Sequence, residues 1–143
     1  KETWNVPIYA CEKEIDVLTD GRKSLVAGYF REPYTITPDV TVKEGDELSI
    51  AGFTWKVFET PGHTIGSCCY YIEKEEVLFP GDTLFAGSYG RTDFPTGSGR
   101  QIAESVRRLL STLPDDTMVY PGHIDTTTIG FEKKYNPLSG AMG

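Results

Sequence analysis

Hydrophobic and polar residues alternate with a period of two along the middle of the chain. Residues 48–50 and 53–58 alternate on either side of a short Ala-Gly turn, which predicts a β-hairpin. Residues 67–72 and 77–79 predict two further strands, and residues 117–120 predict a strand late in the chain. Three of these stretches, 53–58, 77–79 and 117–120, lead into a Pro-Gly pair.

A helical period replaces this alternation after residue 98. Apolar side chains recur there with the spacing i, i+4, i+7 and i+8, namely at Ile102, Val106, Leu109 and Leu110. Ser98 and Gln101 fit a capping box before this stretch, and Pro114 follows its end. We expect the apolar face of this helix to pack in the core.

Shorter elements are predicted on both sides of this central part. Residues 12–19 predict a short helix, and residues 129–135 predict a last one. Residues 1–10 predict a strand, whereas the glycine-rich residues 84–99 predict a loop beside the second Pro-Gly pair. Residues 22–41 contain two prolines and show no clear period.

Length and composition fit one small domain. We place the domain at residues 1–139 of 143 and interpret residues 140–143 as a tag or cloning remnant. The net charge of −7 argues against nucleic acid and against an anionic membrane as partners, and no apolar run approaches membrane-spanning length. Three cysteines, two of them adjacent, do not make a disulfide framework, which favours a reducing, cytoplasmic location.

Three Pro-Gly corners each place a residue that can bind a metal. They read Thr60-Pro61-Gly62-His63, Phe79-Pro80-Gly81-Asp82 and Tyr120-Pro121-Gly122-His123, and the chain has no other histidine. Proline fixes φ and glycine adopts dihedral angles that other residues avoid, so such a corner holds the next side chain on rigid backbone. Imidazole and carboxylate groups suit zinc and neighbouring metals. The repeated pattern indicates a shared metal site, while ordinary turns followed by solvated loop residues stay open as the alternative.

The corners, in this order and with these neighbours, resemble motifs of the metallo-β-lactamase-fold hydrolases. Residues 60–67 resemble the family's middle histidine motif, residues 79–85 its bridging-aspartate motif and residues 120–123 its last histidine motif. Residues 90–94 and the tail at residues 127–137 resemble the glyoxalase II-like branch (hydroxyacylglutathione hydrolases). The resemblance covers nearly the whole chain.

The resemblance implies an α+β fold, namely the C-terminal portion of an αββα sandwich with a two-metal site at one sheet edge. It implies that His63 ligates the first metal, that His123 ligates the second and that Asp82 bridges both. Thr64 and Thr83 each follow one of these residues and are candidates for hydroxyls that support the ligands. Two zinc ions are expected, with iron or manganese as alternatives. The implied substrate is a thioester or ester such as an acyl-glutathione, cleaved by a metal-activated water. The sequence identifies neither a general base nor a substrate-binding residue.

The resemblance also has a gap. The family's His-x-His-x-Asp-His motif is absent, and the two histidines leave no room for a copy of it. We therefore expect the chain to be a fragment corresponding to the C-terminal two thirds of the fold, which binds metal weakly and hydrolyses its substrate poorly alone. Bare sheet edges would favour self-association or a partner chain that completes the sheet. Ile124-Asp125 is a smaller departure from the branch and alters the rim of the site.

Two other functions stay open. A persulfide dioxygenase-like redox enzyme of the same fold would use one iron held by two histidines and an aspartate, and residues 90–94 suit that branch as well. A truncated, non-catalytic domain would act as an assembly unit. Within residues 90–94, Arg91 is a candidate for an anionic substrate, but we expect it to pair with Asp93 and fix the loop.

Overall fold

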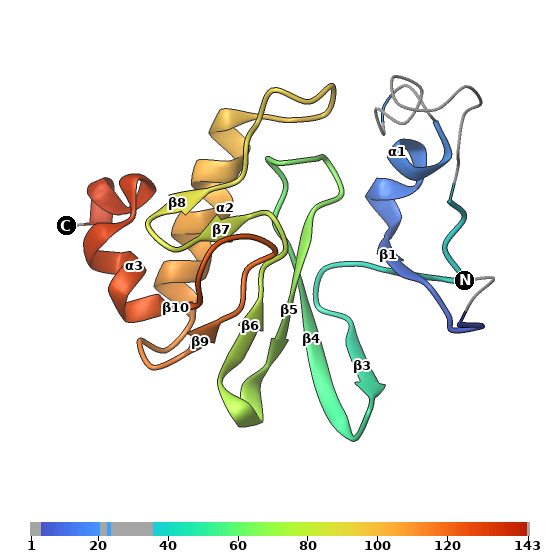
Figure 1. Ribbon diagram of the computed structural model, residues 1–143, viewed down its shortest axis with the longest axis horizontal. Helices are drawn as coiled ribbons and strands as arrows, with labels where there is room; N and C mark the ends of the chain where they lie inside the picture. Colours follow the sequence, from blue (N-terminus) through green and yellow to red (C-terminus); the bar gives the residue numbers. More distant parts are fainter. Residues whose placement is uncertain (1–3, 21–22, 24–35, 143) are drawn as a thin grey trace.

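A six-stranded mixed sheet forms the centre of the protein (Figure 1). The computed structural model describes residues 4–20, 23 and 36–142. The strand order across the sheet is β10-β9-β6-β5-β4-β3. The strands are β3 (Glu47–Ile50), β4 (Phe53–Glu59), β5 (Cys68–Ile72), β6 (Val77–Phe79), β9 (Met118–Val119) and β10 (Thr127–Thr128). All neighbours in this sheet are antiparallel except β6 and β9, which run parallel.

The hairpin of β3 and β4 confirms the pattern of alternating residues. Leu48 lies opposite Trp55, and Ile50 lies opposite Phe53 across the turn. The turn residues Ala51 and Gly52 have φ of 54° and 81°. Two consecutive positive φ angles are typical of a type I′ turn, whose twist matches that of the flanking strands.

Helix α2 (Gly99–Thr112) covers one face of the sheet and supplies much of the core. Its four predicted apolar residues are almost completely buried, and the Ser98 side chain caps it by accepting a hydrogen bond from the Gln101 N–H at 3.2 Å. Leu78 of β6 and Val119 of β9 face the same core. Truncating a leucine in such a core costs about 2–5 kcal/mol of the free energy of unfolding.

Helix α3 (Ile129–Tyr135) and the 3-10 helix η4 (Pro137–Met142) lie beside α2, near the end of the described chain (Figure 1). The Thr128 hydroxyl caps α3 by accepting from the Phe131 N–H at 3.1 Å. The bounds of α3 confirm the predicted last helix. The η4 helix includes residues that we assigned to a tag remnant, and that assignment stays a prediction.

A small N-terminal unit lies on the other side of the sheet from α2 and α3 (Figure 1). It contains β1 (Tyr9–Cys11), which pairs in parallel with β2 (Val40–Val42). The chain between them continues as the 3-10 helix η1 (Glu12–Glu14) and helix α1 (Ile15–Thr19), which confirms the predicted short helix.

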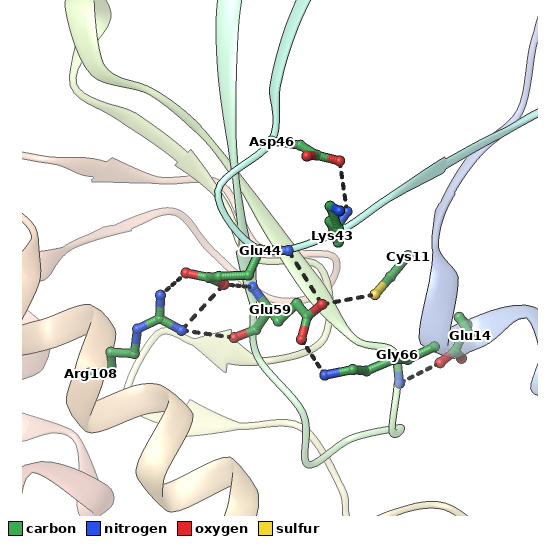
Figure 2. A network of polar contacts seen from close by, with 9 residues as sticks. Cys11, Glu14, Lys43, Glu44, Asp46, Glu59, Gly66 and Arg108 are labelled. Carbon is green, nitrogen blue, oxygen red and sulfur yellow. Dashed lines mark hydrogen bonds and ion pairs between the residues drawn. The ribbon is translucent and has the colours of Figure 1, made fainter.

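Acidic side chains fasten this unit to the sheet, as Figure 2 shows. The carboxylate of Glu14 accepts from the Gly66 N–H at 2.8 Å, and the carboxylate of Glu59 accepts from the Lys13 ammonium at 2.6 Å. The hydrogen bond from Lys13 lowers the pKa of Glu59, and the same bond raises the pKa of Lys13. Arg108 of α2 pairs with Glu44 on the sheet side of the same network.

Two predicted elements are wrong in extent. Of the strand predicted at residues 1–10, the described part forms a strand only from Tyr9, because only there does the backbone find a partner in β2. The loop predicted at residues 84–99 contains a hairpin of two short strands, β7 (Leu84–Phe85) and β8 (Ser88–Tyr89). Most of residues 22–41 lies outside the described residues. No helix in the described ranges is both long and apolar enough to cross a bilayer.

Candidate metal centre

The three Pro-Gly corners meet at one edge of the sheet because of the directions of their strands. Strand β4 is antiparallel to β5, and β5 is antiparallel to β6, so β4 and β6 point the same way. Strand β9 is parallel to β6. Each corner follows the carboxyl end of one of these strands, so His63, Asp82 and His123 leave the sheet at a common edge.

The backbone connects the corners directly. The Gly122 N–H donates to the Gly81 carbonyl at 2.8 Å, which joins the second and third corners. The buried hydroxyls of Thr60 and Thr83 lie 2.9 Å apart and join the first and second. Ser105 of α2 donates to the Pro61 carbonyl at 2.8 Å and supports the first corner from behind. The positions of the three candidate ligands are therefore fixed by backbone and by buried hydroxyl groups.

His63 is oriented by a backbone carbonyl. Its Nδ1 lies 2.8 Å from the carbonyl oxygen of Arg91, and because a carbonyl only accepts, Nδ1 carries the proton. Its Nε2 lies 3.4 Å from Oδ2 of Asp82. The Phe94 ring packs edge-on against the imidazole, with 5.0 Å between ring centroids, and the side chain is 17% exposed.

Asp82 also contacts the second histidine. Its Oδ1 lies 2.8 Å from Nδ1 of His123. His123 is 69% exposed, and its ring meets the edge of Phe85 at 5.7 Å between centroids. The carboxylate of Asp82 thus lies between the two imidazoles and presents one oxygen to each.

The chemistry of these donors fits a cation. With its proton on Nδ1, His63 turns Nε2 toward an oxygen of Asp82 that only accepts. A proton on Nε2 or a metal ion between the two atoms makes such a contact attractive. Within residues 4–20, 23 and 36–142, however, no group of three or more His, Cys, Asp or Glu side chains is arranged so that it could hold a metal ion. The site is a pair of imidazole–carboxylate contacts that share Asp82.

Two glycines leave room for this arrangement. A Cβ on Gly90 would collide with the carbonyl oxygen of Asp82 and would lie 3.2 Å from Nδ1 of His63. A Cβ on Gly122 would lie 2.7 Å from Oδ1 of Asp82. The backbone approaches the candidate ligands too closely for any larger residue at these two positions.

A hollow of about 390 Å³ opens beside the three candidate ligands. Besides them it is lined by Phe85, Ser88, Tyr89, Gly90, Arg91 and Ile124. Ile124 is 66% exposed and has a φ of 66°, which is a strained conformation for a β-branched residue. A second hollow of about 400 Å³ lies between the N-terminal unit and the first two corners and also reaches His63 and Asp82. The candidate centre is therefore accessible from two sides.

The structure places the other predicted residues around this centre. Thr83 bonds to Thr60, and the Thr64 hydroxyl donates to the carboxylate of Glu14 at 2.9 Å. Arg91 pairs with Asp93 through two bonds of 2.6 Å, as the sequence predicts, and this hydrogen-bonded pair lowers the pKa of Asp93 to about 2. The pair is exposed to solvent.

The sequence did not identify the groups that support the candidate ligands and the neighbouring hairpin. It did not identify the Arg91 carbonyl as the partner of His63, because a backbone group carries no signal in a sequence. It did not identify Glu132 and Asn136, whose side chains bond to the β7–β8 hairpin. Polar residues at buried positions of a short helix were the available signal.

Comparisons with known proteins identify a family model and several relatives. The family model described as the metallo-beta-lactamase superfamily matches residues 1–123. An uncharacterized protein of Aquifex aeolicus is 43% identical over 142 residues, which cover 99% of this chain and 67% of that protein. The hydroxyacylglutathione hydrolase GloC of Haemophilus influenzae is 42% identical over 96 residues, which cover 67% of this chain and 45% of GloC. The chain thus spans about two thirds of the first relative and less than half of the second.

Solved structures show the same fold. The crystal structure of the BLEG-1 B3 metallo-beta-lactamase matches with a TM-score of 0.86 and 38% identity, over 97% of this chain and 68% of that one. The crystal structure of TTHA1623 in a di-iron-bound form matches with a TM-score of 0.81 and 32% identity, over 95% of this chain and 66% of that one. The predicted fold class is confirmed.

Proposed function

The chain belongs to the metallo-β-lactamase superfamily, and from this premise we propose that it carries part of the active site of a metal-dependent thioester hydrolase. The relatives named above are longer than this chain, so the proposal concerns the activity of a whole protein of which this chain supplies three ligands. The reaction class is cleavage of an acyl–sulfur bond by water.

One observation carries the proposal, namely that Asp82 presents one carboxylate oxygen to each of two imidazoles. His63, Asp82 and His123 would hold the metal, with the carboxylate of Asp82 shared between the two histidines. When bound, such metals lower the pKa of a coordinated water and stabilise negative charge on a carbonyl oxygen. Zinc fits this donor set, and iron or manganese fits it as well.

The chain's own residues give the site its orientation and its walls. The Arg91 carbonyl keeps a proton of His63 on Nδ1, which leaves Nε2 as the ring nitrogen that can bind a metal. Phe85 and Ile124 make the neighbouring hollow partly apolar, which suits an acyl chain or a thiol leaving group next to the reacting carbonyl. No side chain of the described hollow is positioned as an obvious general base.

The name of one relative supports the choice of a thioester. GloC is named a hydroxyacylglutathione hydrolase, and it is 42% identical over the matched part. We propose an acyl-glutathione or a similar thioester as the substrate class. The three cysteines are free thiols in the structure, which supports the proposal of a reducing compartment such as the cytoplasm.

The second candidate function is the iron-dependent, persulfide dioxygenase-like reaction. The di-iron form of TTHA1623 supports iron as a metal for this fold at 32% identity. The two functions differ in what they consume. A hydrolase releases one thiol for each thioester without oxygen, whereas a dioxygenase consumes oxygen and requires iron.

The test is thioester hydrolysis by the chain alone and by the chain preceded by a His-x-His-x-Asp-His segment, each loaded with zinc or with iron. We expect thiol release that depends on Asp82, is weak for the chain alone and rises in the extended protein. Asp82→Asn should abolish it, and Asp116→Asn, an equal charge change in the turn before β9, should not. Thiol release that is equal in wild type and Asp82→Asn would contradict the proposal, and oxygen uptake with iron would favour the second function.

A further inference from the structure

Glu132 is a buried acid that the proposed chemistry does not use. It lies on α3, its side chain is 0% exposed, and it is outside the hollow that contains the candidate ligands. Glutamate is almost never fully buried unless it is paired, because transfer of a carboxylate out of water is costly. A residue that bears this cost needs a specific partner.

The partner is the turn of the β7–β8 hairpin. Both carboxylate oxygens of Glu132 face the Gly87 N–H, at 2.6 and 3.1 Å. Asn136, the residue that follows the end of α3, donates from its side-chain amide to the Ser88 carbonyl at 2.9 Å. Helix α3 and the residue after it therefore hold two consecutive residues of the hairpin, Gly87 in the turn through its N–H and Ser88 of β8 through its C=O.

The hairpin links two groups of the candidate centre. Strand β7 begins two residues after Asp82, and its Phe85 ring packs against the ring of His123. After β8 the chain passes through Gly90 to Arg91, whose carbonyl meets Nδ1 of His63. The hairpin thus connects Asp82 to the Arg91 carbonyl that contacts His63.

The hairpin is short, and its turn residue Gly87 is exposed. Its strands have only two residues each, and an isolated pair of this length is not stable in water. Gly87 has a φ of 70°, which suits the turn and adds no side-chain contact. Burial of Leu84 anchors the start of β7 in the core, and the side chains of Glu132 and Asn136 add hydrogen bonds at Gly87 and Ser88.

We propose that Glu132 and Asn136 are positioning residues that fix the β7–β8 hairpin and, through the Arg91 carbonyl, keep Nε2 of His63 turned toward Asp82. The functional consequence rests on the proposed metal centre, since a correctly oriented His63 matters only if it ligates a metal. The positioning itself is a property of the metal-free chain and is tested there.

Three substitutions distinguish a positioning role of Glu132 from a role in packing alone. Glu132→Met keeps an unbranched side chain of similar length in the buried space but removes the acceptor. Glu132→Gln keeps an acceptor oxygen and removes the charge. Thr128→Ala removes the hydroxyl that caps α3 and weakens this helix without touching the hairpin.

The first readout is nuclear magnetic resonance of the metal-free chain. We expect the Gly87 amide to exchange with solvent roughly tenfold faster in Glu132→Met than in wild type, relative to amides of β5. The ring nitrogens of His63 should shift from a single Nδ1-protonated form toward a mixture of tautomers. Glu132→Gln should keep the Gly87 exchange rate and the His63 tautomer close to those of wild type. Thr128→Ala should change these two quantities only as far as it lowers overall stability.

The second readout is the zinc dissociation constant, measured by competition with a chelator. Loss of a group that orients a ligating histidine weakens metal binding roughly 10–100-fold, so Glu132→Met should fall in that range and Glu132→Gln should not. If wild type binds no zinc, the proposed function fails while the resonance data still decide the positioning role.

Three results would overturn the inference. One is that Glu132→Met leaves the Gly87 exchange rate and the His63 tautomer unchanged. Another is that Glu132→Gln is as disturbed as Glu132→Met, because the acceptor would then be irrelevant. The third is that Thr128→Ala reproduces the His63 change. If Glu132→Met does not fold, Glu132→Asp, which keeps the charge but shortens the reach to Gly87, is judged by the same readouts.

Discussion

At the scale of single residues, Ile124 is held in a conformation that L-amino acids avoid. Its φ of 66° lies in the left-handed region, and the side chain is 66% exposed at the rim of the hollow. Strain of this kind is typical of functional sites. We expect Ile124→Gly to raise the free energy of unfolding by up to about 1 kcal/mol, because glycine adopts this φ at little cost.

Urea unfolding measures this effect, and Ile65→Gly is the matched control. Ile65 is another exposed isoleucine next to the site, but its φ is not positive, so its replacement should lower stability. A loss of stability in both variants would show that Ile124 is not strained.

Gly90 gives the second prediction at this scale. We expect Gly90→Ala to lower the free energy of unfolding by about 1–3 kcal/mol, the usual cost of overpacking, because the new Cβ would meet the Asp82 carbonyl. It should also shift the ring resonances of His63, which lies 3.2 Å from that Cβ. Gly140→Ala, where no atom lies within 4 Å of the added carbon, is the control. A stable Gly90→Ala variant with an unchanged His63 would contradict the close packing described here.

At the scale of elements, the N-terminal unit is attached to the sheet by a titratable pair. The pKa of Glu59 is lowered, so the stability it contributes is present above its unfolded pKa and is lost as pH falls through its folded pKa. The pKa of Lys13 is raised, so its contribution is complete below its unfolded pKa and is lost as pH rises through its folded pKa.

We therefore expect Lys13→Met to weaken the pH dependence of the free energy of unfolding in two ranges. One lies below the ordinary pKa of glutamate, and the other lies above that of lysine. The effect should be small, since the Lys13 side chain is 53% exposed. Urea unfolding across pH measures it, with Lys74→Met as the control, because Lys74 lies in the 3-10 helix η3 (Glu73–Glu75), outside this pair. Parallel profiles for wild type and Lys13→Met would show that the pair does not contribute.

Strand β5 gives another prediction at this scale through its two cysteines. Burial raises the pKa of Cys69 to about 12 and also raises the pKa of Cys68, as it does for Cys11 of β1. Thiolates are the reactive form, so we expect all three thiols of the folded chain to react slowly with a disulfide reagent near pH 8. In the unfolded chain, all three thiols should react rapidly with the reagent. A fast thiol in the folded chain would contradict the burial of these residues.

The elements that the sequence predicted well are those whose own pattern determines them. The hairpin of β3 and β4 combines alternation with an Ala-Gly turn, and α2 combines a four-residue apolar face with a cap at Ser98. The β7–β8 hairpin was missed because its strands have two residues each and because its bonds to Glu132 and Asn136 come from more than forty residues away. Local patterns carry no information on such distant bonds.

At the scale of the whole molecule, the parallel directions of β4, β6 and β9 explain why three separate corners form one candidate site. This convergence could be predicted, because the repeated Pro-Gly context marks the ends of strands. The proton on Nδ1 of His63 and the two-sided access could not, since they depend on the Arg91 carbonyl and on the packing of the N-terminal unit. The assembly of this chain with a further segment or a second chain stays a proposal.

The most direct test of the central claim is zinc binding to this chain, measured by titration calorimetry with wild type, Asp82→Asn and Asp116→Asn. The account predicts a weak site in wild type, a dissociation constant at least about tenfold higher in Asp82→Asn and no change in Asp116→Asn. Equal zinc binding by wild type and Asp82→Asn would contradict the claim that Asp82 joins His63 and His123 into a metal centre.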